Sequence, residues 1–269
     1  MKETSVDKSK ITELAERLTR ARLEEGPVEQ LSKEVQEFEA VDAYKIQDLG
    51  IKHRLDQGEI FKGLKMGLTS KAKREQMNLS SPLYGVLTDK MEIPNGGTFS
   101  MRKTIHPKIE PEIAFVLKKD ISKKIDIEEA SECCNALLPA LEILDSRYTQ
   151  FKYFSLEDVI ADNASSSHYI LGEQKADFSS IDLLNLKMEM YIDGKLEKEG
   201  ISKDISGHPL LSIVELSNLM TDRGLTIKAG SVILAGAATA AVMLRPGMDC
   251  RLVVQDLGEV RVKVQNEES

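Results

Sequence analysis

Two glutamates, Glu110 and Glu112, alternate with apolar residues in the run IHPKIEPEIAFVL over residues 105–117. Side chains of a β-strand point alternately to its two faces, so both glutamates share one face with small and apolar residues. The odd-numbered positions form a second, wholly apolar face. Both faces therefore read as buried, and the two carboxylates, about 7 Å apart along the strand, point into a dry region. Two buried anions are costly unless a cation or protons compensate them.

A third glutamate, Glu142, stands about thirty residues later inside the apolar run ALEIL. Three acids in apolar strands favour a hard divalent cation with oxygen ligands, Mg²⁺ or Mn²⁺. The histidines and cysteines show no zinc-like spacing. In the alternative interpretation, Glu110 and Glu112 line a solvated edge and form salt bridges with residues such as Lys108 or Arg147. The residue types alone leave both interpretations open.

Further candidate residues lie near expected turns. Lys65 ends a β-like run in KMGLTS, where it either meets a substrate carboxylate, delivers a proton, or is a solvated surface group. Asp162 and Ser165 lie in VIADNASSS, residues 159–167, and the usual role of such residues is to cap a helix. The small residues of AGAATAA, residues 235–241, either let a ligand approach the backbone or pack tightly.

The pattern of apolar residues predicts an α+β protein. Residues 1 to about 57 have helical spacing, and we expect a helical N-terminal segment over 1–58 and a β-rich catalytic domain over 59–269. A helix is expected from a cap at Asp126 to Pro139, and another over Pro209–Asp222, with His208 in a structural role at its start. Strands are predicted at 60–68, 91–94, 109–118, 141–145, 186–193, 231–236, 250–255 and 259–264, the last two joined by a tight turn at Asp256-Leu257-Gly258.

Composition excludes several classes of function. The 269 residues carry 36 Lys+Arg against 44 Asp+Glu, a net charge of -8, and such a chain repels nucleic-acid phosphates. It has no apolar stretch that would span a bilayer and no secretory h-region at its start. The three cysteines, Cys133, Cys134 and Cys250, read as reduced, buried thiols. We therefore expect a cytoplasmic enzyme with neither nucleic acid nor membrane as partner.

Several segments together resemble one enzyme family. In chain order they are GLKMGLTSKAKREQM, SPLYGVLTDKM, HPKIEPEIAFVL, LEILDSRYTQFKYFSLEDVIADNASSS, GHPLLSIVELSNLM and AGAATAAVMLRPGMD. They resemble the hydratase/decarboxylase family of meta-cleavage pathways, within the fumarylacetoacetate hydrolase superfamily, from roughly residue 10 to 264. Residues 81–85 (SPLYG) and 146–148 (SRY), with Phe151-Lys152, are more similar to its decarboxylases than to its hydratases.

This resemblance implies a fold and a site. The fold would be a mixed, mostly antiparallel β-sheet roll after the helical segment. Glu110, Glu112 and Glu142 match the family's ligands for Mg²⁺ or Mn²⁺, Lys65 matches the lysine of its K-x-GLTS run, and Asp162 with Ser165 matches its ADNAS loop beside the substrate. Pro111 departs from the family, where Ala is commoner. Because proline donates no ladder hydrogen bond, we expect this strand to be an edge or to carry a bulge.

The resemblance also implies a reaction: metal-dependent decarboxylation of the dicarboxylate 2-oxo-3-hexenedioate to 2-hydroxypenta-2,4-dienoate and CO₂, without an organic cofactor. The alternatives are a 2-hydroxypenta-2,4-dienoate hydratase that uses the same metal, and a catalytically silent homologue that is a structural subunit. Implied partners are the small dicarboxylate substrate, further copies in an oligomer, and the cognate hydratase in a complex.

Overall fold

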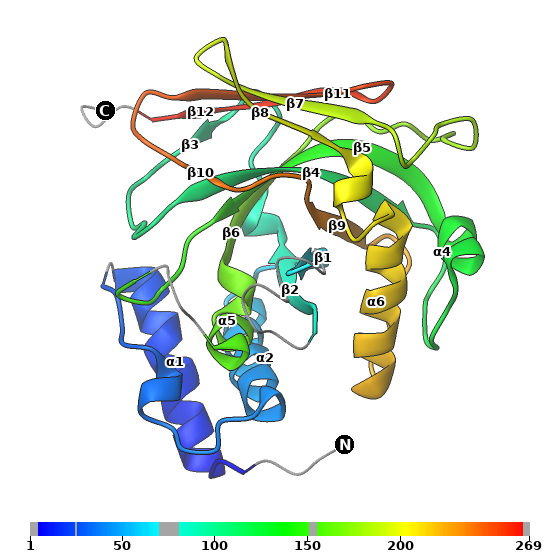
Figure 1. Ribbon diagram of the computed structural model, residues 1–269. Coiled ribbons are helices and arrows are strands. Elements are labelled where there is room, and N and C mark those ends of the chain that lie inside the picture. The colour runs from blue at the N-terminus through cyan, green and yellow to red at the C-terminus, as the bar shows by residue number, and fades with distance from the viewer. Residues whose placement is uncertain (1–4, 25, 70–80, 151–154, 266–269) are drawn as a thin grey trace.

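The computed structural model describes residues 5–24, 26–69, 81–150 and 155–265 (Figure 1). Its α-helices are α1 (Lys8–Glu24), α2 (Ala40–Asp56), α4 (Ile127–Cys133), α5 (Leu156–Ala161) and α6 (Pro209–Asp222). Short 3₁₀ turns are η1 (Leu31–Lys33), η2 (Asp89–Met91), η3 (Asn163–Ser165) and η4 (Ser202–Asp204). Its strands are β1 (Phe61–Gly67), β2 (Leu83–Thr88), β3 (Thr98–Phe99), β4 (Lys108–Leu117), β5 (Cys134–Leu144), β6 (Ser166–Leu171), β7 (Lys187–Ile192), β8 (Lys195–Ile201), β9 (Val232–Ala237), β10 (Val242–Met243), β11 (Asp249–Val254) and β12 (Gly258–Val264).

The strands form two sheets. One has the order β2-β1-β9-β4-β5-β6, with β10 also paired to β4, and the other has the order β3-β12-β11-β7-β8. Most pairs are antiparallel; β1–β9 and β12–β3 are parallel. The second sheet lies across the curved strands β4 and β5, while α1, α2 and α5 lie at the opposite end of the first sheet (Figure 1). This confirms the predicted mixed, mostly antiparallel α+β roll with an N-terminal helical segment.

Strand β4 is buried on both faces, as its alternation predicts. Its odd-numbered side chains Ile109, Ile113 and Phe115 belong to the large hydrophobic core, which also takes in residues of α1 and α2. Ala114, on the face of Glu112, packs instead in a separate apolar cluster. The two glutamates therefore project from the same face of β4 as Ala114.

The predictions around Asp126 were partly wrong. Asp126 does cap a helix, accepting a hydrogen bond from the Glu129 amide at 2.9 Å. The helix ends at Cys133, however, and β5 begins at the next residue and contains Pro139 in its interior. The apolar run that follows the cysteines is buried on both faces, and such a run lacks the period that separates strand from helix. Pro139 is tolerated because it stands just beyond the residues of β5 that pair with β6, Ala140 to Leu144.

Pro111 was expected either in an edge strand or at a bulge, and the structure decides between the two. Strand β4 is not an edge strand, because β5 pairs with one side of it and β9 and β10 with the other. The expected irregularity is present, since the register between β4 and β9 shifts between Glu112 and Ala114. The Pro111 carbonyl accepts a hydrogen bond from the Ala238 amide at 3.1 Å. Proline's missing donor thus faces the gap where pairing passes from β9 to β10.

Other expectations met mixed outcomes. The helix Pro209–Asp222 is confirmed, with His208 as its N-cap, and so is the tight turn between β11 and β12. The strand expected at 91–94 is wrong, because η2 ends at Met91 and no strand follows until β3. Strands β2, β3, β6, β8 and β10 were not predicted. All three cysteines are free. No helix in the described part of the chain is long and apolar enough to cross a membrane.

Candidate metal centre

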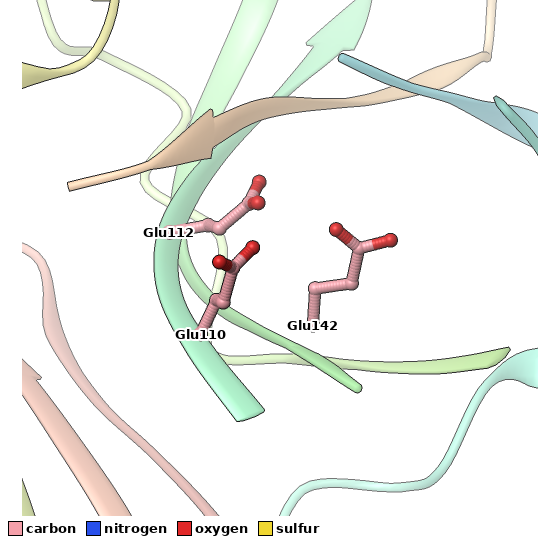
Figure 2. A group of neighbouring side chains, drawn as sticks. All are labelled: Glu110, Glu112 and Glu142. Atoms are coloured by element: carbon pink, nitrogen blue, oxygen red, sulfur yellow. The ribbon is translucent and has the colours of Figure 1, made fainter. Parts of the chain in front are cut away.

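The three predicted carboxylates meet in space. Glu110 and Glu112 come from β4, and Glu142 stands directly opposite Glu110 on β5. Residues paired across antiparallel strands project to the same face, so the register alone brings these side chains together. One ligand oxygen from each carboxylate lies within 4.8 Å of the others. Figure 2 shows the three carboxylates turned toward one shared space.

Each of the two deeply buried glutamates has fixed partners. The Lys65 ammonium donates to Glu142 Oε2 at 3.1 Å, and the Ser166 hydroxyl donates to Glu142 Oε1 at 2.9 Å. The Gly236 amide donates to Glu112 Oε2 at 2.9 Å. The other oxygen of Glu112, Oε1, is buried and has no hydrogen-bond partner among the residues that the structure describes. A buried acceptor left in this state costs about 1–3 kcal/mol.

The electrostatics of the cluster are dominated by desolvation. Burial raises the pKa of Glu112 well above its usual range, and repulsion from Glu142 and Glu110 raises it further. The nearby Lys65 charge and the Gly236 amide oppose this rise in pKa without cancelling it. One buried ammonium thus does not compensate the charge of three carboxylates, and the charged form of Glu112 is disfavoured.

The donor set fits a hard divalent cation. Three carboxylates supply the oxygen ligands that Mg²⁺ and Mn²⁺ prefer, and three ligands leave positions open for substrate or water. The unpartnered Oε1 of Glu112 is the atom that a cation would satisfy. The interpretation as a solvated edge is wrong for Glu112, which is 1% exposed, whereas Glu110 is half-buried. Arg147, which the solvated-edge interpretation suggested as a salt-bridge partner, instead has its Nε 3.6 Å from Asp162 Oδ1.

The small-residue run that begins at the end of β9 is tightly packed, and its backbone contacts a glutamate of the cluster. Gly236 has a φ of +108°, which L side chains rarely adopt, and its amide reaches Glu112. A Cβ at this position would stand 2.5 Å from the Thr69 hydroxyl oxygen, so the segment is also tightly packed. Lys65 is likewise placed by its neighbours, because β1 lies between β2 and β9. Lys65 is 3% exposed, which excludes the surface interpretation of this lysine.

Asp162 and Ser165 lie in the loop between α5 and β6. The Ser165 hydroxyl donates to Asp162 Oδ2 at 3.2 Å, and the Arg147 amide donates to the same oxygen at 3.2 Å. Ser165 itself is not the serine that contacts the glutamates; its neighbour Ser166 is. Sequence reasoning missed this contact and that of Gly236. The signal for Ser166 was the run of three serines, which does not say which of them faces the site.

The loop is held in an unusual backbone conformation. Asn163, Ala164 and Ser165 have φ values of 52°, 56° and 53°, in the left-handed region that costs free energy for residues other than glycine. Asn163 holds the loop against β2, because its side chain accepts from the Val86 amide at 2.7 Å and donates to the Val86 carbonyl at 3.0 Å. Gly85 permits this approach, since a Cβ there would lie 2.7 Å from the Asn163 carbonyl oxygen.

Comparison with known proteins agrees with this site. The fumarylacetoacetate (FAA) hydrolase C-terminal family matches residues 63–265. The chain belongs to this family. A 4-oxalocrotonate decarboxylase from Pseudomonas sp. is 42% identical over 261 residues, covering 96% of this chain and 99% of the relative. A 2-hydroxyhexa-2,4-dienoate hydratase from Comamonas testosteroni is 32% identical, covering 96% and 98% respectively.

Solved structures include a relative with a metal. The 4-oxalocrotonate decarboxylase from Pseudomonas putida G7, complexed with magnesium and adipate, has a TM-score of 0.94 at 35% identity, covering 97% of this chain and 100% of that chain. The resemblance inferred from the sequence motifs is therefore confirmed. Parts of the motifs that carried it, residues 70–77 and 151–154, lie outside the described residues, and these include Ser70, Phe151 and Lys152.

Replacing Glu112 tests the metal site. We expect Glu112→Gln to weaken Mg²⁺ and Mn²⁺ binding at least tenfold, because it removes one of three anionic ligands. We expect the metal-free variant to be no less stable than the metal-free parent, because a costly buried carboxyl is replaced by a neutral amide. Isothermal titration and thermal unfolding measure the two effects. Glu128→Gln, the same change at an exposed glutamate of α4, is the control. A destabilised variant with unchanged metal affinity would contradict the ligand assignment.

Asp162 predicts a pH dependence of stability. Burial raises its pKa to about 7 from 3.8, against the opposing effects of Arg147 and the hydrogen bonds it accepts. The folded protein therefore binds more protons than the unfolded chain between these two values. The contribution of Asp162 to stability is full below pH 3.8 and is lost as pH rises through about 7. Asp162→Asn should flatten the decline in melting temperature between pH 4 and pH 8. An unchanged profile would show that the Asp162 carboxyl is not protonated in the fold.

Proposed function

We propose that the protein is a metal-dependent decarboxylase that converts 2-oxo-3-hexenedioate to 2-hydroxypenta-2,4-dienoate and CO₂. The observation that carries the proposal is the cluster of Glu110, Glu112 and Glu142 around an unsatisfied carboxylate oxygen, beside a buried lysine. The 42% identity to a 4-oxalocrotonate decarboxylase, against 32% to the hydratase, favours this reaction within the family. All proposed site residues fall within 59–269, the segment that we assign as the catalytic domain.

The substrate's own chemistry sets the task of the site. 2-Oxo-3-hexenedioate is a vinylogous β-keto acid: when the C5–C6 bond breaks, C6 leaves as CO₂ and the electron pair moves through the C3–C4 double bond to the C2 oxygen. A divalent cation, when bound, supplies Lewis-acid stabilisation of negative charge on that oxygen. The reaction then needs a proton at the C2 oxygen, and it needs no organic cofactor.

Lys65 is the residue that we assign to this charge and proton. Its ammonium is held at the cluster by Glu142 and is shielded from water, so it stabilises an adjacent oxyanion more strongly than a solvated lysine does. Three protons on Nζ allow it to keep Glu142 and still donate to a substrate oxygen. The apolar cluster on the same face of the sheet, which includes Ala114, favours loss of the charged carboxylate as neutral CO₂.

Asp162 and Ser165 are assigned to positioning the substrate. Their hydrogen bond and the left-handed backbone of the loop fix the point where β6 begins. Ser166 enters the cluster from this point, with its hydroxyl on Glu142. A rigid loop beside the metal ligands can hold a substrate in the orientation that the reaction requires.

The decisive experiment measures CO₂. We expect the purified protein with Mg²⁺ to release CO₂ from 2-oxo-3-hexenedioate, and we expect the release to stop on chelation and to return with added metal. Glu112→Gln should abolish it, whereas Glu128→Gln should not. Hydration of 2-hydroxypenta-2,4-dienoate without CO₂ release would overturn the proposal in favour of the hydratase. Absence of both activities would favour the silent structural homologue, against which the retained Lys65 and glutamates argue.

We also infer a partner. The family resemblance implies an oligomer and a complex with the cognate hydratase, and the dicarboxylate adipate in the related structure supports a small dicarboxylate as ligand. A mixture of the two purified enzymes should elute together in size-exclusion chromatography, earlier than either enzyme alone. Separate elution at micromolar concentrations of both would contradict the complex.

A further inference from the structure

A second polar cavity lies apart from the glutamate cluster. It encloses about 250 Å³ between the end of α1, the segment that precedes β4, and β6. Its charged lining consists of Arg22, Arg54, Lys90, Arg102, Lys103 and Arg147, with Asp145 as the single carboxylate. None of the three metal-site glutamates contributes to it. Six cationic side chains around one cavity are unexpected in a chain whose net charge is -8.

Among the described residues, the carboxylates near the cavity are fewer than these cations. The Arg54 guanidinium donates two hydrogen bonds, of 2.9 and 2.7 Å, to the same oxygen of Glu59. Arg22 reaches the other oxygen of Glu59 only at 3.7 Å, which is too long for a hydrogen bond. The Asp145 carboxylate is likewise already hydrogen-bonded, because it accepts from the backbone amides of Ile105 and His106. Arg54 and Arg22 thus pair with the same carboxylate, and the ion pair of Arg22 with Glu59 is the longer and weaker of the two.

Arg147 adds a third guanidinium at the same place. It donates to the carbonyl oxygens of Asp145 and Ser166, and its Nε lies 3.6 Å from Asp162. Arg147 is 6% exposed and Arg54 is 5% exposed, so neither charge is dispersed by water. Asp162 offsets this charge only in part, since its own pKa is raised to about 7 by burial.

The pKa values of two side chains, His168 and Arg22, are lowered in part by these positive charges. Burial, followed by repulsion from Arg147, Arg54 and Arg22, lowers the pKa of His168 to about 4, so His168 is neutral at physiological pH. Burial, followed by repulsion from Arg54 and Arg147, lowers the pKa of Arg22 to about 10. The crowding of three guanidiniums is thus unfavourable in the protein alone, and an anion in the cavity would relieve it.

We propose that this cavity is a second binding site, which takes a small oxyanion of the carboxylate or phosphate class between Arg22, Arg54 and Arg147. The planar guanidinium fork matches both groups and binds them through paired, charge-assisted hydrogen bonds. Lys90, Arg102 and Lys103, which are exposed at the cavity wall, attract such an anion from solution. The site is independent of the proposed reaction, and its ligand needs no metal.

The test is anion binding by metal-free protein, in which the glutamate cluster repels anions. Inorganic phosphate and adipate are titrated by calorimetry and by thermal unfolding, with sodium chloride at equal ionic strength as the reference. We expect at least one of the two anions to bind saturably, at about one per chain, and to raise the melting temperature above that in chloride. The stronger of the two ligands identifies the class. No binding beyond the chloride reference would overturn the proposal.

Matched variants locate the bound anion. Arg22→Gln should weaken binding by roughly tenfold or more, because a charged partner in a half-buried site is lost. Arg20→Gln, two residues earlier on α1 and exposed, should leave it unchanged. Lys103→Gln changes an exposed wall residue that donates a hydrogen bond to the Leu23 carbonyl, and we expect this variant to fold. It should weaken binding roughly twofold to fivefold. Equal affinity in the parent, Arg22→Gln and Lys103→Gln would place the anion elsewhere and refute the site.

Discussion

The cost of burying two carboxylates beside a third, half-buried one is the constraint on which the rest of this structure depends. Glu112 and Glu142 are 1% and 0% exposed, and desolvation and mutual repulsion both act against their charges. In water such a group would disperse, but here the register of β4 and β5 fixes Glu110 opposite Glu142. The two strands are themselves held by apolar packing on both faces, and this packing offsets the free-energy cost of the carboxylate cluster. A fold that maintains this arrangement is organised for a cation.

The elements around the cluster each supply one contact and leave one atom unsatisfied. Strand β1 brings Lys65, the start of β6 brings Ser166, and the end of β9 brings the Gly236 amide. These three donors serve three of the four oxygens on the buried glutamates. The fourth, Glu112 Oε1, has no hydrogen-bond partner in the described part of the chain. Because the other donors are fixed by β-ladders and by a strained loop, a ligand can bind there without rearranging the site.

The sequence was sufficient where a pattern was local and strict. Alternation along β4 predicted both its faces, and Glu142 in an apolar run predicted the third carboxylate of the cluster. The length of β5 was not predictable, because a strand buried on both faces has no period, and Pro139 suggested an end where there is none. Ser166 was missed for a different reason: the register between β5 and β6 shifts between Ile143 and Leu144, next to a left-handed turn. Neither irregularity leaves a pattern in residue types. Pairings such as Arg147 with Asp162 depend on tertiary placement alone.

Net charge describes the long-range behaviour of this protein and misdescribes its interior. The excess of acidic residues acts on a polyanion such as nucleic acid, whose charges extend well beyond the screening length of about 8 Å at physiological salt. A small anion inside a cavity experiences mainly the groups that line it. At the glutamate cluster those are Lys65 and the cation that the carboxylates require, and at the second cavity they are Arg22, Arg54 and Arg147. An acidic chain can therefore repel nucleic acid at its surface and still hold small carboxylates within, because the two interactions are governed by different charges at different distances.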